Sequence, residues 1–452
     1  MCCLAHREPL RAVGKNAMNR ILTILLLSAY CYLAAFTTVE GEAGAAGGVS
    51  GRVVEADFLM LGLFVPAFLL AGRIRMAPNF WFYLAFMGAM LLSLILAQDP
   101  GDGVVEYTVH LFNFAAGVAI FNLCVNARDF SLSDAIYAFF YAVGVVSVLC
   151  LLQFFVFPDW FGGRQVGGLV GTFRNTGQSG TYFGTALALF VPAMATRLIA
   201  RNPVNLFLLL LMVMCLVLTV KRAALLGLLV GVIGMMATAV FTGSLEDRRR
   251  NITFFVIALI AAPLGLQGYD YATENVKGLE NRMERKVENF STDEFLDKFF
   301  GENAGSALRA FEDEPLVGVG PGNIIGDYTE KYEIHSTPLS ILSSTGLLGF
   351  TLYLTFLLHW LVTIFRAGTG PLLEHRFLRL MFPMVIGLIV SWGYTYHVRK
   401  REFWIVYGIV MFGCWLVGNY RAKSTEQLAA ARPTLTPEQD FPRPGFLAER
   451  RG

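Results

Sequence analysis

A histidine and a pair of cations stand at the edges of apolar stretches, where they could act on a phosphorylated substrate. His335 is followed almost at once by a long apolar run, and Lys221 and Arg222 separate two further apolar runs with almost no loop between them. A neutral imidazole can accept a proton from a hydroxyl nucleophile. A guanidinium binds phosphate or pyrophosphate through two parallel hydrogen bonds. Together these groups could activate a hydroxyl and stabilise a pyrophosphate leaving group.

Each of these groups also has an ordinary structural explanation. His335 could cap the following helix or hydrogen-bond to the preceding loop. Arg222 could reach the phosphates of lipid headgroups at a membrane surface. His110 lies in an apolar stretch one helical turn after Glu106, so we interpret it as a structural residue hydrogen-bonded to that carboxylate.

A second group of polar side chains, Arg174, Asn175 and Gln178, lies in the glycine-rich stretch GTFRNTGQSG. They could contact a sugar or a phosphate, or they could belong to a surface turn, and the residues alone favour neither. The later stretch GVGPGN (318–323) lacks the strand–turn–helix context of a dinucleotide site. We expect it to form a tight turn that positions His335.

The elements that must position these residues are membrane helices. The chain is 55% hydrophobic and 15% charged, whereas soluble proteins carry about 25% charged residues. Apolar windows of about 17–25 residues recur from end to end. They predict an all-α polytopic membrane protein with about twelve transmembrane helices, near residues 21–39, 56–72, 79–98, 104–125, 134–157, 181–198, 204–220, 223–243, 252–267, 337–365, 377–396 and 403–420.

The distribution of lysine and arginine predicts the orientation of these helices. With a cytoplasmic N-terminus, the inner segments are rich in arginine, whereas the outer segments 40–55 and 99–103 contain only Arg52. The predicted order is helices 1–9 in 1–267, one long outer loop with helical stretches in 268–336, helices 10–12 in 337–420 and a cytoplasmic tail in 421–452. The tail is polar and contains four prolines, so we expect it to be disordered.

The outer face nevertheless holds cations that this topology should exclude. They are Arg164, Arg174, Lys221, Arg222, Arg399, Lys400 and Arg401. A basic residue that conflicts with the predicted orientation and also lies next to apolar helices usually faces the protein interior and has a partner. Because several converge on one face, we favour an anionic ligand such as pyrophosphate as that partner. For the segment 397–401 alone, lipid headgroups are the favoured partner.

No cofactor and no metal site are predicted. Of the seven cysteines, five lie in apolar stretches and two at the extreme N-terminus, and no Cys/His spacing suggests zinc. The net charge of +2 gives no indication of nucleic-acid binding.

Four stretches, in this order, resemble motifs of the O-antigen ligase and Wzy-type O-antigen polymerase superfamily. They are GTFRNTGQSGTYF (171–183), LTVKRAALLGLLVG (218–231), EDEPLVGVGPGN (312–323) and HSTPLSILSSTGLLGF (335–350). In the second, Lys221 stands where the family has serine. The resemblance covers roughly residues 135–420 and implies a metal-independent, inverting glycosyltransferase of the GT-C type.

The resemblance also implies substrates and a place. The donor would be a glycan on undecaprenyl pyrophosphate, presented at the periplasmic face of the bacterial inner membrane, and the acceptor would be lipid A–core or another glycan. His335 would match the family's essential histidine, the proposed base, and Arg222 the arginine that binds the donor pyrophosphate. Further substrate contacts are assigned to Lys221, Arg174, Asn175 and Gln178.

The family uses one more arginine, in the large loop ahead of a tryptophan. The matching stretch here has no tryptophan, so Arg282, Arg285 and Arg309 are all candidates for this second pyrophosphate ligand.

Four alternatives to an O-antigen ligase stay open, two of which are a protein O-oligosaccharyltransferase with the same chemistry and a structural scaffold. The other two differ more clearly in what they predict. A polymerase of O-antigen or exopolysaccharide repeat units would use the same residues with a different acceptor. A transporter of polysaccharide or lipid-linked sugar would show inverted repeats and discontinuous helices with charges near the membrane midplane. The sequence shows no internal repeat, and Glu106 is the main charge within the spans. Polar residues gather at the outer edge instead, which favours an enzyme.

Overall fold

The structure is a computed structural model, which describes residues 7–36, 74–97, 99–162, 168–242, 304–324, 328, 334–396 and 399–431. The predicted spans 56–72 and 252–267 lie outside the described residues, as do the loop arginines Arg282 and Arg285.

The described part of the chain is helical, and its long helices coincide with the other ten predicted spans. They are α1 (Arg7–Leu33), α3 (Pro78–Leu96), α4 (Pro100–Asn126), α5 (Leu132–Phe155), α6 (Thr176–Ala195), α7 (Pro203–Leu218), α8 (Arg222–Thr242), α13 (Thr337–Ala367), α14 (Leu373–Trp392) and α15 (Arg401–Ala431), with the short η2 (Trp160–Gly162) and α12 (Gly305–Asp313). Six of them are long and apolar enough to cross a membrane. These helices agree with a multi-pass membrane protein, and the number twelve stays a prediction.

Short polar motifs fix where several helices begin. Asp99 caps the N-terminus of α4, and Asn202 caps that of α7. Ser131 and Asp134 form a reciprocal capping box at the start of α5. Each cap satisfies N–H groups that the first helical turn leaves without a partner.

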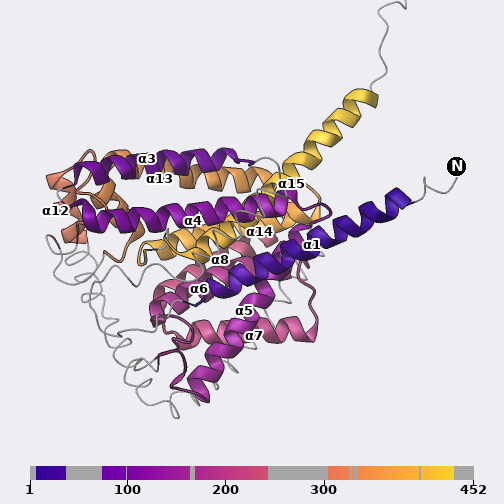
Figure 1. Ribbon diagram of the computed structural model, residues 1–452, viewed down its shortest axis with the longest axis horizontal. Coiled ribbons are helices and arrows are strands. Elements are labelled where there is room, and N and C mark those ends of the chain that lie inside the picture. Colours follow the sequence, from indigo (N-terminus) through magenta and orange to yellow (C-terminus); the bar gives the residue numbers. More distant parts are fainter. Residues whose placement is uncertain are drawn as a thin grey trace, which may run out of the picture.

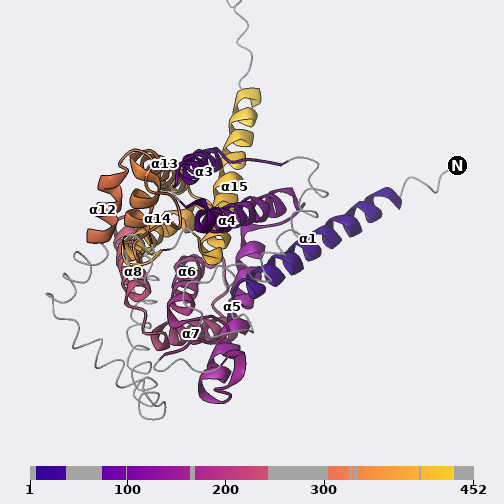
Figure 2. The ribbon, with the colours of Figure 1, turned by 60° about the vertical axis from the view of Figure 1, so that its left-hand side comes forward.

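The helices pack side by side along a common direction (Figures 1 and 2). α3 lies beside α13, α4 beside α15, α8 beside α14 and α1 beside α5. Large aromatic side chains such as Tyr83 and Trp404 are fully buried between them, whereas Phe207, Phe241 and Leu358 are exposed on the outside. Apolar surface of this kind suits contact with lipid.

The connections gather at two ends of the bundle. One end, called here the α12 end, holds α12 and the starts of α6, α8, α13 and α15 (Figure 1). There the hydroxyl of Thr337 donates to the carbonyl of Thr395 and ties α13 to the α14–α15 connection. At the opposite end, Arg20 of α1 pairs with Asp134 of α5 at 2.7 Å. Of the segments predicted to lie outside, the described parts 99–103, 221–222 and 399–401 lie at the α12 end.

Helix α13 is interrupted at Gly346, which adopts φ +61° and ψ −164°. This conformation is open essentially to glycine alone. The break frees backbone groups, and a preceding segment of the chain satisfies them. The N–H groups of Leu347 and Leu348 donate to the carbonyls of Pro315 and Leu316 at 2.9 and 3.1 Å.

The same segment continues along α13 on the other side of the break. The N–H groups of Val319 and Gly320 donate to the carbonyls of Ser343 and Ser344, both at 3.1 Å. Gly318, Gly320 and Gly322 all have positive φ. The expected tight turn at GVGPGN is therefore confirmed, and it fills the break in the neighbouring helix.

Some helix ends differ from their predicted positions. α6 begins at Thr176 rather than at 181, because Asn175 caps it. α1 ends at Leu33, before the predicted 39. α15 continues as a helix to Ala431, so the first part of the predicted disordered tail is helical.

Candidate functional site

The connection between α7 and α8 is a strained turn that carries the two predicted cations. α7 ends at Leu218, and Val220 adopts φ +55°, an outlier for a β-branched residue. Its side chain is only 5% exposed. Such a conformation costs about 1–3 kcal/mol and persists only where its surroundings impose it. The turn thus holds Lys221 and Arg222 at the start of α8.

Lys221 packs against the first turn of α6. Any side chain at Gly180 would overlap Lys221, and the ammonium of Lys221 lies near Gly177. The hydroxyl of Thr219 supports the turn, since it accepts from the N–H of Lys221 at 3.3 Å and donates to the carbonyl of Leu216 at 2.7 Å. The first turn of a helix favours anions, and a lysine beside it adds to that preference. We call Lys221, Arg222 and the first turn of α6 the cationic edge.

Asn175 and Gln178 belong to the cap of α6. The side chain of Asn175 accepts from the N–H of Gln178 at 2.9 Å, and the side chain of Gln178 accepts from the N–H of Arg174 at 3.3 Å. The side chain of Arg174 is exposed. These bonds give the two amides a structural role in shaping the cationic edge, and Arg174 stands at its rim.

His335 lies at the entry to α13 with an exposed side chain. Its neighbours Ile334 and Ser336 are both about 2% exposed, so the backbone here is anchored while the imidazole faces outward. Ser336 occupies the N-cap position of α13 but makes no side-chain capping bond. His335 therefore sits on the surface of the α12 end.

Arg309 is the one loop arginine among the three candidates that the structure describes. Its guanidinium lies 3.3 Å from the hydroxyl of Ser306 and 3.5 Å from the carbonyl of Tyr328. The Tyr328 hydroxyl in turn donates to Asp313 at 2.6 Å. Arg309 thus helps to fasten α12 to the chain that follows it.

The two principal predicted residues reach the same end of the bundle on different helices. Arg222 opens α8 and His335 precedes α13. α14 packs against both of these helices, so it stands between them (Figure 2). The structure brings Lys221 together with the cap of α6, and it places Arg222 and His335 at the starts of two different helices.

A cleft of about 420 Å³, counting its open mouth, is present at the α12 end. Its lining consists of Met90, Glu106, Pro321, Gly322, Ile324, Ile334, Ser340, Ser344, Tyr396 and Arg399. Neither Arg222 nor His335 belongs to this lining, although Ile334 directly precedes His335. We call it the Glu106 cleft.

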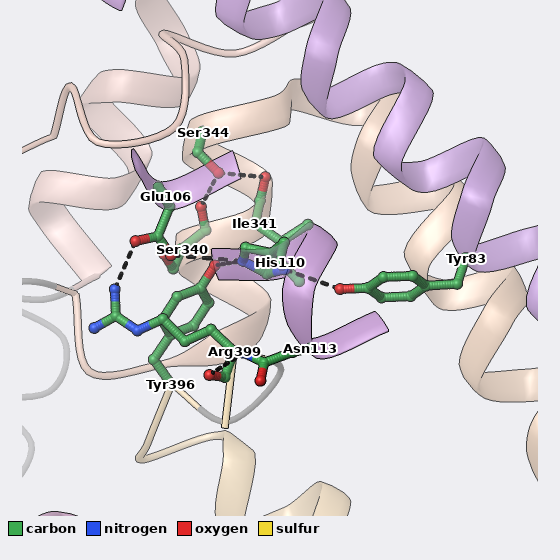
Figure 3. Close-up of polar contacts among 9 residues, drawn as sticks. All are labelled: Tyr83, Glu106, His110, Asn113, Ser340, Ile341, Ser344, Tyr396 and Arg399. Carbon is green, nitrogen blue, oxygen red and sulfur yellow. Dashed lines mark hydrogen bonds and ion pairs between the residues drawn. The ribbon is translucent and has the colours of Figure 1, made fainter. Parts of the chain in front are cut away.

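The floor of the Glu106 cleft is a connected set of polar side chains (Figure 3). Glu106 accepts from the guanidinium of Arg399 at 2.8 Å, and these side chains are only 7% and 15% exposed. His110 lies 3.5 Å from Glu106. Its ring also hydrogen-bonds the hydroxyls of Tyr83 at 2.8 Å and Tyr396 at 2.9 Å. The Arg399 guanidinium stacks 4.7 Å from the Tyr396 ring centroid.

This cleft corrects one prediction and confirms part of another. Arg399 was assigned to lipid headgroups with the rest of 397–401, but it turns inward to Glu106 because a carboxylate buried between helices requires a cation. His110 lies near Glu106 as predicted, at 3.5 Å, but its ring nitrogens hydrogen-bond Tyr83 and Tyr396 rather than the carboxylate. The sequence feature that indicates an inward-facing cation is Glu106, the main charge within the predicted spans, because a buried carboxylate needs a positive partner. Within the described ranges, no group of three or more His, Cys, Asp or Glu side chains is arranged to hold a metal ion.

Comparison with known proteins covers part of the cationic edge and part of the Glu106 cleft. No curated protein matches the chain. A family model described as O-antigen ligase matches residues 207–354. This segment runs from α7 into α13 and contains Lys221, Arg222 and His335, whereas Glu106 and Arg399 lie outside it. The match confirms the resemblance to the O-antigen ligase family over residues 207–354, whereas the first of the four motifs, at 171–183, lies outside it.

Proposed function

We propose that this protein is an inner-membrane glycosyltransferase that transfers a glycan from undecaprenyl pyrophosphate to an acceptor hydroxyl, joining O-antigen to lipid A–core. The observation that carries the proposal is the family match, which includes both the strained turn with Lys221 and Arg222 and the entry to α13 with His335.

The cationic edge binds the pyrophosphate of the donor. Arg222 offers a bidentate guanidinium, Lys221 adds a point charge, and the first turn of α6 contributes N–H groups. The strained turn at Val220 supports this role, because strain of this kind gathers at ligand-binding sites. Arg174 and Arg309, both at the α12 end, are the further arginines within reach of a long lipid-linked glycan.

His335 acts as the base. The acceptor hydroxyl gives its proton to the neutral imidazole while its oxygen bonds to the anomeric carbon of the donor. The bond from that carbon to the pyrophosphate oxygen breaks, and its electron pair leaves with undecaprenyl pyrophosphate. Attack from the face opposite the leaving group inverts the anomeric configuration. Lys221 and Arg222 stabilise the negative charge that develops, without a metal ion.

The α12 end is the periplasmic face in this proposal. Arg20, Arg75 and Arg128 lie toward the opposite end, where α1 and α3 begin and α4 ends. An excess of arginine marks the cytoplasmic side of membrane proteins. The donor glycan is then presented on the same side as the cationic edge.

The test is a transfer assay with purified protein, lipid-linked O-antigen and lipid A–core. His335→Ala should lower the initial rate by about 100-fold or more, because a general base contributes about 10²–10⁴. Arg128→Ala, which changes an exposed arginine at the opposite end, serves as the matched control. A chelator should leave the rate unchanged.

The products separate the candidate activities. Glycan on lipid A–core indicates a ligase, whereas longer lipid-linked chains with unmodified core indicate a polymerase. Full activity of His335→Ala would remove the histidine from the mechanism.

One observation favours the transporter alternative, namely the break in α13 at Gly346. Broken helices commonly form the substrate sites of transporters. Here residues 315–320 of the same chain fill the break, so it also fits an enzyme. The test is to reconstitute the protein in liposomes with a fluorescent lipid-linked glycan and to measure movement of the glycan between leaflets. Movement without glycan transfer would contradict the proposed enzyme and support a transporter.

A further inference from the structure

The Glu106 cleft is assembled from parts of the chain that only the fold brings together. Met90 comes from α3, Glu106 from α4, Pro321 from the turn that fills the α13 break, Ser340 from α13 and Arg399 from the α14–α15 connection. Such a junction between elements is where ligand pockets commonly occur.

The charges in the cleft favour a neutral ligand with hydroxyl groups. Glu106 and Arg399 neutralise each other at 2.8 Å, so the pair offers no net charge to a phosphate. A carboxylate and a guanidinium side by side still offer acceptors and donors for neighbouring hydroxyls. This distinguishes the cleft from the cationic edge, where both charged side chains are positive.

The walls of the cleft suit the carbon skeleton of a sugar ring. Met90, Pro321, Ile324 and Ile334 supply apolar surface, and Ser340 and Ser344 add hydroxyl-bearing residues. The volume of about 420 Å³ includes the open mouth of the cleft, so the cleft holds the edge of a small ligand rather than enclosing one.

The polar set behind the pair holds it in place. His110 is fully buried and bridges the hydroxyls of Tyr83 and Tyr396, and the side chain of Asn113 donates to the carbonyl of Arg399 at 2.8 Å (Figure 3). This fixes both the backbone and the aromatic neighbour of Arg399. A carboxylate and a guanidinium positioned so firmly can present their hydrogen-bonding groups to a ligand with little reorganisation.

Stability alone is a weak reason for such a pair. Burying two opposite charges costs so much desolvation that apolar side chains of similar size often stabilise a fold equally well or better. Here the pair also lines an open cleft rather than a closed core.

We propose that the Glu106 cleft is the subsite for a sugar ring of the acceptor. Glu106 accepts hydrogen bonds from ring hydroxyls, and Arg399 donates to their oxygens. Ile334 in the wall directly precedes His335, so the cleft adjoins the chain segment that carries the proposed base. This subsite rests on the proposed glycosyltransferase function and specifies how its acceptor is recognised.

The experiment compares Glu106→Gln and Arg399→Lys with a control, Arg128→Ala. The control removes an exposed arginine at the opposite end of the bundle, outside the cleft lining. The KM for lipid A–core and the KM for lipid-linked O-antigen are measured separately. Each cleft variant should raise the acceptor KM about tenfold, the loss of one charge-assisted hydrogen bond, and leave the donor KM within about twofold. The control should change neither constant.

A second measurement is independent of catalysis. Binding of the soluble core oligosaccharide, released from lipid A by mild acid, is followed by saturation-transfer NMR on the full-length protein in detergent. His335→Ala should retain binding, whereas Glu106→Gln and Arg399→Lys should weaken it about tenfold.

The outcomes separate the two proposals. If His335→Ala retains full transfer, the proposed function fails. Binding of the core oligosaccharide in the NMR titration then tests the sugar site independently of transfer. If transfer depends on His335 but both cleft variants keep the wild-type acceptor KM and binding, the subsite is overturned while the function stands. An equal rise in the KM of both substrates for Glu106→Gln would give the pair a structural role alone and would also overturn the subsite.

Discussion

The cationic edge and the Glu106 cleft stand at the same end of the bundle but differ in net charge. At the edge, Lys221 and Arg222 follow a strained residue and lie beside the first turn of a helix, so positive charge accumulates. In the cleft, Glu106 and Arg399 cancel each other. The difference teaches that one end of the bundle can combine a cationic surface and a charge-neutral polar cleft at separate places, each with its own arrangement of charge.

The largest effect should come from the backbone that supports the cleft. Gly346→Val places a β-branched side chain at φ +61°, where its Cβ would overlap the backbone of Leu316. We expect loss of more than about 4 kcal/mol, in the range seen when a special conformation and a tight contact are both violated. Size-exclusion chromatography in detergent should show little monodisperse protein.

Gly88→Ala in α3 is the matched control, because nothing lies within 4 Å of its added methyl group. It should be neutral or stabilise by about 0.5–1 kcal/mol. Normal yield and thermal stability of Gly346→Val would show that the break does not need glycine.

The next effect tests the cationic edge. Arg222→Ala should lower transfer about 100-fold and leave thermal stability intact, since removing one preorganised charge-stabilising group typically costs about 10²–10³ in rate. Arg222→Lys should recover only part of the loss, because an ammonium cannot form the bidentate contact. Inorganic pyrophosphate should inhibit the wild type competitively with donor and inhibit Arg222→Ala less. A variant with unchanged pyrophosphate inhibition would contradict the assignment.

The third prediction concerns the ion pair between Glu106 and Arg399 in the cleft. Glu106→Ala alone leaves the Arg399 charge poorly compensated and should lower the free energy of unfolding by about 3 kcal/mol. Arg399→Ala should act similarly, and the double variant should lose less than the sum of the two. Thermal midpoints of the four proteins give the coupling. Strict additivity would mean that the 2.8 Å contact contributes nothing.

The smallest effect is expected at the strained turn. Val220→Gly removes a buried side chain but also relieves a left-handed conformation, so the two contributions should nearly cancel, within about 1 kcal/mol. Val143→Gly, at a fully buried position in α5, should cost about 3 kcal/mol, since a cavity and a helical glycine add. Thermal unfolding of the two variants checks the contrast. Equal losses would argue that Val220 carries no strain.

The two regions also differ in how far the sequence predicts them. The apolar windows located ten described helices, because the length and hydropathy needed to cross a membrane are local properties. Lys221 and Arg222 were found for the same reason, since their anomaly is visible between two adjacent apolar runs.

The cleft could not be found in this way. Glu106 and Arg399 are separated by 293 positions, and no local pattern shows which buried carboxylate meets which outer cation. The inward turn of Arg399 depends on Asn113, which only the packing of α4 against α15 brings near. The break in α13 was hidden because Gly346 lies in an otherwise apolar run, and its partner is a distant loop.

That break has a consequence for the assembly of the protein. A helix entering a bilayer normally arrives with its backbone hydrogen bonds complete. α13 lacks this independence, because the N–H groups of Leu347 and Leu348 find their acceptors only at Pro315 and Leu316. The preceding segment must therefore dock before the span reaches its final form. Insertion of α13 into the membrane and completion of its backbone hydrogen bonds are therefore two separate events. The second event depends on Pro315 and Leu316, which precede His335 in the chain.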